Sequence, residues 1–95
     1  MDAELVANLQ TDIGDGQRVE LVVWLLPRQL PGSAHPYKYR LAFIVDGVCV
    51  LRFDNEAGKG DHWHLGEREF PYEFTDVETL KVDFWTEVDK WLKTR

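Results

Sequence analysis

The feature that most constrains the fold is a pair of strand-like runs, residues 37–45 and 48–54, on either side of Asp46-Gly47. Both runs are rich in β-branched and aromatic residues, and Asp-Gly favours the two-residue type I′ turn of a β-hairpin. Such a turn predicts one-for-one pairing outward from the loop, which places these residues opposite each other: Val45 and Val48, Phe43 and Val50, Tyr39 and Asp54, Lys38 and Asn55. The sequence therefore predicts an antiparallel sheet around this hairpin, whose open end is polar.

Apolar patterning predicts three more strands. Residues 5–9 form the first, a turn ending in Asp15-Gly16 follows, and residues 18–26 form a long second strand that is apolar on both faces in its later half. Prolines at positions 27, 31 and 36 predict a loop, because proline lacks the backbone donor that a strand ladder needs. Residues 61–65 are predicted to form a short final strand.

The last third of the chain predicts one helix. Thr75 and Glu78 match a capping box, in which the two side chains satisfy free amides at a helix start, and the helix should run from about Asp76 to near Lys93. Apolar residues keep helical spacing along it: Val77, Leu80, Phe84, Val88, Trp91 and Leu92. The predicted class is α+β: a twisted antiparallel sheet of four to five strands with a C-terminal amphipathic helix packed on one face, forming a single domain over residues 1–95.

Cysteine content and hydropathy indicate the compartment. Cys49 is the only cysteine, so no intrachain disulfide can form, which suits a reducing environment. No run approaches the roughly 18 apolar residues of a membrane span. The acidic start, Met1-Asp2-Ala3-Glu4, is unlike a secretory signal. We therefore expect a cytoplasmic protein with no membrane partner.

Net charge disfavours a polyanionic partner overall but not locally. The formal charge is −6, whereas phosphate contacts are made by Lys and Arg. Residues 1–16 contain acidic residues and no Lys or Arg, while residues 17–68 balance seven Lys and Arg against six Asp and Glu. The charge thus leaves room for a local phosphate site.

Side chains that could carry chemistry gather in residues 53–64, among them Asp54, Asn55 and Asp61. In an extended chain, His62 and His64 lie on one face with Cα atoms about 6.5 Å apart, and such a pair can act as proton donor and acceptor. Gly58-Lys59-Gly60 lacks the spacing of a Walker motif, but its amides and ammonium can still approach a phosphate. Lys38 and Arg40 point to one sheet face and add positive charge, although they can also be ordinary solvated residues.

A metal site is a weaker interpretation of the same segment. His-x-His together with Asp54 or Asp61 offers nitrogen and oxygen ligands, but the sequence shows no second ligand pair elsewhere. This set is too sparse for a closed tetrahedral site. From the sequence we expect no bound metal and no other cofactor.

Several motifs in order resemble the TumE family of toxin-antitoxin proteins: His35-Pro36-Tyr37-Lys38-Tyr39-Arg40, Asp54-Asn55-Glu56, and Gly58-Lys59-Gly60-Asp61-His62 followed by His64. The resemblance covers nearly the whole chain. It implies a prokaryotic toxin-like protein, encoded beside an antitoxin that resembles a winged-helix DNA-binding protein. Trp63, Phe70 and Glu73 depart from the family's pattern, and these changes imply a less basic surface than in its relatives.

The resemblance and the residues together lead to the hypothesis of a metal-independent ribonuclease that acts on RNA. Its candidate catalytic residues are His62 and His64 as acid and base, with Asp54 and Asp61 beside them. Its candidate phosphate and substrate contacts are Lys38, Arg40, Lys59 and Asn55, with Tyr37 or Tyr39 stacking on a base. Two alternatives remain: a non-catalytic interaction module that docks through the polar hairpin end, and a metal-dependent hydrolase that uses the same histidines.

Overall fold

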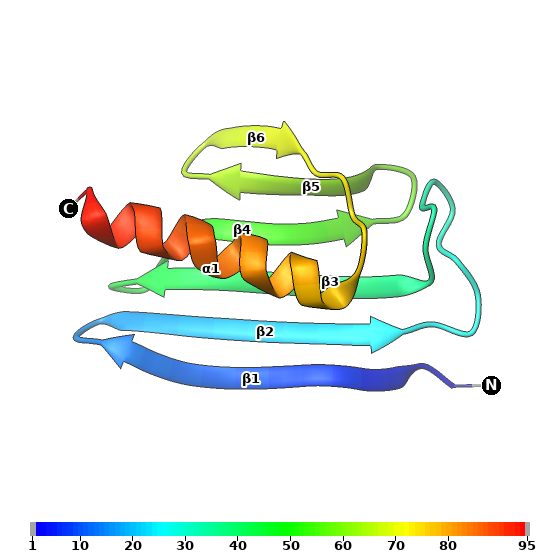
Figure 1. Ribbon diagram of the computed structural model, residues 1–95, viewed down its shortest axis with the longest axis horizontal. Coiled ribbons are helices and arrows are strands. Elements are labelled where there is room, and N and C mark those ends of the chain that lie inside the picture. Colours follow the sequence, from blue (N-terminus) through cyan, green and yellow to red (C-terminus); the bar gives the residue numbers. More distant parts are fainter. Residues whose placement is uncertain (1, 95) are drawn as a thin grey trace.

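The computed structural model describes residues 2–94, which form six strands and one helix. The elements are β1 (Glu4–Gly14), β2 (Gln17–Leu25), β3 (Tyr37–Val45), β4 (Val48–Glu56), β5 (Gly60–Leu65), β6 (Arg68–Pro71) and α1 (Val77–Lys93). The strands follow chain order in one antiparallel sheet, and α1 lies across one face over β3 and β4 (Figure 1). Within residues 2–94, no helix has the length and apolar character needed to cross a membrane.

The predicted α+β class with one antiparallel sheet and a C-terminal helix is confirmed, but the sheet has six strands rather than four to five. The strand that the sequence did not reveal is β6, which pairs with β5 and makes β5 an inner strand. Its four residues, Arg-Glu-Phe-Pro, are too short and too polar for a recognisable strand pattern. Side-chain packing holds this strand against β5, since the rings of Trp63 and Phe70 stack with centroids 4.5 Å apart.

The predicted register of the β3–β4 hairpin is correct only next to its turn. Val45 lies opposite Val48, but a β-bulge then shifts the pairing by one residue, so that Phe43 faces Leu51 instead of Val50. Asp54 consequently lies opposite Arg40 rather than Tyr39. The predicted pairs Phe43–Val50, Tyr39–Asp54 and Lys38–Asn55 are therefore wrong.

The burial of apolar side chains explains this bulge. Without the extra residue, Arg52 and Asp54 would point into the core, and Leu51 and Phe53 would point out of it. With the bulge, Leu51 and Phe53 are each only 1% exposed beneath the helix. A one-residue slip moves a whole strand segment to the other face, so burying these two side chains outweighs the local loss of pairing.

Helix α1 closes the core, but it starts one residue later than the capping box requires. Asp76 is the N-cap residue, and its Oδ1 accepts a hydrogen bond from Thr79 N at 2.7 Å. That backbone hydrogen bond holds the pKa of Asp76 below its usual value. The helix inserts its fully buried side chains into a core shared with β2, β3 and β4: Leu80, Phe84 and Val88 from the helix, and Val19, Val23, Leu41, Phe43, Leu51 and Phe53 from the sheet.

Candidate functional site

Strand alternation divides the predicted site residues between two faces of the sheet. We call the face opposite α1 the open face. Two rows of side chains cross it from strand to strand, each made of residues that lie directly opposite one another. The first row contains Val22, Arg40, Asp54 and His62, and the second contains Glu20, Ala42, Arg52, His64 and Glu69.

Asp54, His62 and His64 meet on this face, and we call these three residues the histidine cluster. Asp54 Oδ1 lies 2.8 Å from His62 Nε2 and 4.0 Å from His64 Nε2. The two imidazole rings are nearly perpendicular, with centroids 4.8 Å apart. The other carboxylate oxygen, Asp54 Oδ2, lies 2.9 Å from Arg52 Nε. The cluster therefore combines two imidazoles, one carboxylate and an adjacent guanidinium.

Burial makes the cluster unusual. Asp54 is 8% exposed and His62 is 4% exposed, whereas the His64 side chain retains 21% exposure. Four buried atoms face one another at its centre: Arg52 Nε, Asp54 Oδ1, His62 Nε2 and His64 Nε2. Within the described residues, none of these four atoms makes a hydrogen bond. The contacts of Asp54 with Arg52, His62 and His64 nevertheless have the distances of ion pairs. Buried polar atoms are normally satisfied, so this group calls for a physical explanation.

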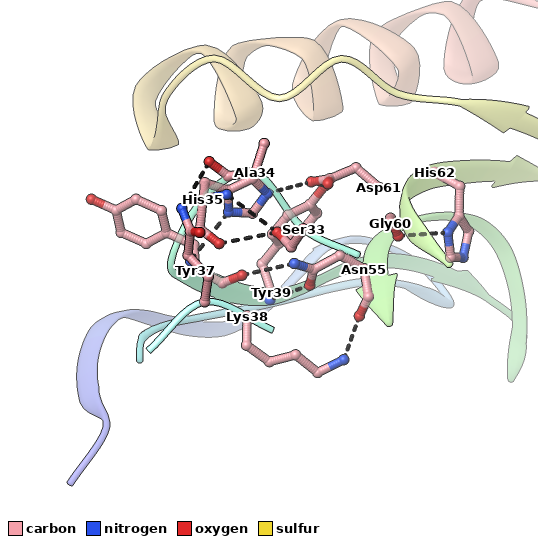
Figure 2. Close-up of polar contacts among 11 residues, drawn as sticks. Ser33, Ala34, His35, Tyr37, Lys38, Tyr39, Asn55, Gly60, Asp61 and His62 are labelled. Atoms are coloured by element: carbon pink, nitrogen blue, oxygen red, sulfur yellow. Dashed lines mark hydrogen bonds and ion pairs between the residues drawn. The ribbon is translucent and has the colours of Figure 1, made fainter. Parts of the chain in front are cut away.

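The contacts of each imidazole restrict its protonation. His62 Nδ1 lies 3.3 Å from Gly60 O (Figure 2) and His62 Nε2 lies 2.8 Å from Asp54 Oδ1, so both ring nitrogens face oxygens that only accept hydrogen bonds. A neutral imidazole carries one N–H hydrogen, so it can donate to only one of these two oxygens. Burial, followed by the charges of Arg52 and His62, lowers the pKa of His64, which favours its neutral form.

A hollow of about 250 Å³ adjoins the cluster on the open face. It is lined by Val22, Trp24, Lys38, Tyr39, Arg40, Asp54 and Glu56. Lys38 Nζ donates to Asn55 O (Figure 2), and Arg40 Nη1 lies 3.7 Å from Glu20 Oε1. Lys59 is exposed in the turn between β4 and β5, outside the residues that line this hollow.

Two residues of this site were not found from the sequence. Arg52 lies beside the cluster, and the period of two already places it on the same face as Asp54, a signal that the sequence analysis did not use. Trp24 lies opposite Lys38 and is 37% exposed at the rim of the hollow. A strand that is apolar on both faces of its later half gives no sign that Trp24 would be exposed.

Four of the predicted site residues lie on the helix face instead: Tyr37, Tyr39, Asn55 and Asp61. Asp61 Oδ2 accepts a hydrogen bond from Tyr39 Oη at 2.6 Å and lies 2.7 Å from His35 Nε2 (Figure 2). The His35 ring stacks on Phe74 with centroids 3.9 Å apart. Burial and the contact with Asp61 raise the pKa of Tyr39, so its phenol stays protonated. These contacts tie the proline loop to the sheet.

The glycine-lysine-glycine turn also has a packing role. Gly58 N donates to Pro31 O at 2.6 Å, which draws the turn against the proline loop. A Cβ added at Gly32 would lie 3.1 Å from Gly58 Cα, and Gly32 has a φ of +83°. Both the positive φ and the close approach require glycine at this position.

Comparison with known families agrees with the motifs of the sequence. The family model described as Toxin TumE matches residues 2–92, nearly the whole chain. Comparisons with curated proteins and with solved structures give no match.

Proposed function

Because this chain belongs to the TumE toxin family, we propose that it is the toxin of a toxin-antitoxin module and that its open face binds and cleaves RNA. The observation that carries the proposal is the histidine cluster beside a hollow lined by two cationic side chains and a tryptophan. Convergent titratable groups next to a concave surface are the usual mark of a reacting centre.

The hollow has the components that single-stranded RNA needs. Trp24 is exposed enough to stack on a base, and base stacking on aromatic rings is the main way in which unpaired RNA is held. Arg40 lies 3.7 Å from Glu20, a distance loose enough for its guanidinium to exchange this partner for a phosphate. Asp54 belongs both to the lining of the hollow and to the cluster, so a nucleotide seated there would place its phosphate next to the reacting groups.

The burial of the imidazoles bears on how the cluster would act. Both Nε2 atoms are buried and face Asp54, so direct proton exchange between each of these atoms and RNA would require the rings to turn. His64 is the most exposed member and is the one that we expect to meet the substrate. We propose that Lys59, which lies in the β4–β5 turn outside the hollow, contacts a phosphate of the RNA beyond the nucleotide in the hollow.

We expect Trp24→Ala to weaken binding of single-stranded RNA by about 5- to 150-fold, because stacking on one base contributes roughly 1–3 kcal/mol. Fluorescence anisotropy with a labelled oligoribonucleotide measures this change. Trp24→Phe should restore much of the binding. Val48→Ala is the matched control, since Val48 is 63% exposed and lies next to the hairpin turn, outside the hollow. Equal losses for Trp24→Ala and Val48→Ala would contradict the proposed groove.

Family membership also implies an antitoxin partner. The partner that we propose resembles a winged-helix DNA-binding protein and covers the open face near the β4–β5 turn. Such a protein is basic where it meets DNA, and the charge of −6 on this chain would favour association with it. We expect the complex to weaken as salt rises and to protect residues 55–66 from hydrogen exchange. Protection confined to α1 would show that inhibition does not work by covering this site.

A further inference from the structure

We infer that the histidine cluster is a binding site for one divalent transition-metal ion, with Zn²⁺ as the representative ion. The ligands are Asp54 Oδ1, His62 Nε2 and His64 Nε2. This inference deepens the proposed function and rests on it for the role of the metal in RNA cleavage, although metal binding itself can be measured without any cleavage.

The positions of the three ligand atoms support this site. They lie within 4.8 Å of one another, and the two distances from Asp54 Oδ1 are 2.8 and 4.0 Å. Tetrahedral coordination with ligand bonds of about 2.0–2.1 Å separates ligand atoms by about 3.3 Å, between these two values. The third pair of ligand atoms, the two Nε2 atoms, lies within 4.8 Å and would close by up to about 1.5 Å to reach this separation, which rotations of the two imidazoles can share. An ion at the centre would also give each of the three orphaned ligand atoms a partner.

The surrounding contacts are those that support metal ligands. A ligating histidine usually donates its other ring N–H to a carbonyl or carboxylate, and ligating carboxylates are themselves hydrogen-bonded or paired. His62 meets the first condition through Nδ1 and Gly60 O at 3.3 Å, and Asp54 meets the second through Arg52 at 2.9 Å. A bound cation would accept the Nε2 lone pair and pair with the Asp54 oxygen, while Nδ1 would keep a hydrogen directed at Gly60 O.

The register of the sheet identifies Asp54 as the carboxylate ligand, which the sequence alone could not. The sequence left the choice between Asp54 and Asp61 open, and it favoured a metal-free protein because the ligand set looked sparse. Asp61 lies on the helix face with Tyr39, whereas the register of β4 against β5 places Asp54 directly opposite His62 and within 4.0 Å of His64. Two imidazoles and one carboxylate suit Zn²⁺ and its first-row neighbours better than Mg²⁺, which prefers oxygen ligands.

Three protein ligands are characteristic of catalytic rather than structural zinc sites, because a coordination position stays open for water or substrate. Here the partly exposed side chain of His64 and the hollow beside Asp54 give access to that position. A metal in this place would polarise a phosphate oxygen or activate water for the proposed cleavage of RNA.

The test uses the whole chain, freed of metal with a chelator that is then removed, and titrated with ZnCl₂ in a calorimeter. We expect saturable binding of about one ion per chain, a rise in melting temperature, and visible absorption bands when Co²⁺ is used instead. His64→Gln should lower Zn²⁺ affinity at least about 10-fold, as expected for the loss of one ligand. Two controls should bind Zn²⁺ normally, because neither replaced residue is a proposed ligand. Glu69→Gln removes a neighbouring carboxylate, and Cys49→Ser removes the only thiol.

Two results would overturn the metal site: no saturable binding of Zn²⁺ or Co²⁺ to the wild-type chain, or equal affinity in folded His64→Gln. The cluster would then be an ion-pair network of His62, Asp54 and Arg52. RNA cleavage that persists in chelator would leave the proposed ribonuclease standing without the metal. Specific metal binding without any RNA cleavage would support the metal site and contradict the proposed ribonuclease.

Discussion

Replacing His64 by glutamine is expected to abolish growth arrest when the chain is produced without its antitoxin, and to slow RNA cleavage at least about 100-fold. His64 has the most exposed side chain of the cluster, so it can contact the substrate while it lies beside the carboxylate of Asp54. Glutamine keeps a polar side chain of similar reach but lacks the imidazole that proton transfer or metal ligation requires. The same partial exposure should keep the fold intact.

The measurement pairs a toxicity assay with cleavage of a labelled RNA and a circular-dichroism melt. Glu69→Gln is the matched control, because Glu69 lies directly opposite His64 and changes the charge of the same face without removing a cluster member. His62→Gln should cost activity and stability together, since His62 is 4% exposed. Full toxicity of both folded His64→Gln and Asp54→Asn would remove the cluster from the mechanism. Small losses spread evenly over the open face would instead indicate a docking surface.

Asn55→Ala is expected to lower the free energy of unfolding by about 2–5 kcal/mol, a large fraction of the stability of a small domain. Asn55 is fully buried, and its side chain continues the β3–β4 ladder beyond the last backbone pair, Arg40 with Asp54. Its Oδ1 accepts from Tyr39 N at 3.0 Å, and its Nδ2 donates to Tyr37 O at 2.7 Å (Figure 2). Alanine would leave a buried donor and a buried acceptor without partners.

Urea denaturation of the two asparagine variants Asn55→Ala and Asn8→Ala separates this role from a general effect of losing an amide. Asn8 lies exposed on the edge strand β1, so its replacement should change stability little. Asn55 was a candidate substrate contact from the sequence, and the two roles give different results. An Asn55→Ala chain that is as stable as wild type but does not cleave RNA would contradict the structural role and favour the substrate contact.

Local patterns predicted the elements well because their causes lie within a few residues. Asp46-Gly47 sets a tight turn wherever it occurs between strand-like runs, and the hairpin is present with that turn. The helical spacing of Leu80, Phe84 and Val88 identified the buried stripe of α1. The period of two likewise placed His62 and His64 on the same face, where both now meet Asp54.

Partners across strands were harder to predict, since they depend on how whole strands align. The strand β6 became recognisable only through its packing against Trp63. Alternation within residues 61–65 already separates Asp61 from the two histidines, but the pairing of Asp54 with His62 depended on the register of β4 against β5. The capping box predicts Thr75 as the N-cap residue, whereas Asp76 caps the helix; threonine and aspartate are both good caps, so the local sequence does not select between these neighbours.

Residues close together in the chain were enough to predict the hairpin, the helix and the alternation that puts His62 and His64 on one face. Which acidic residue joins them depends on how β4 and β5 align in the folded sheet. Alternation is a property of one strand, but facing residues on neighbouring strands depend on the register, and a single bulge changes it for every residue beyond. The β4–β5 register places Asp54 opposite His62, while burial of Leu51 and Phe53 under α1 favours the β3–β4 bulge that turns this pair to the open face.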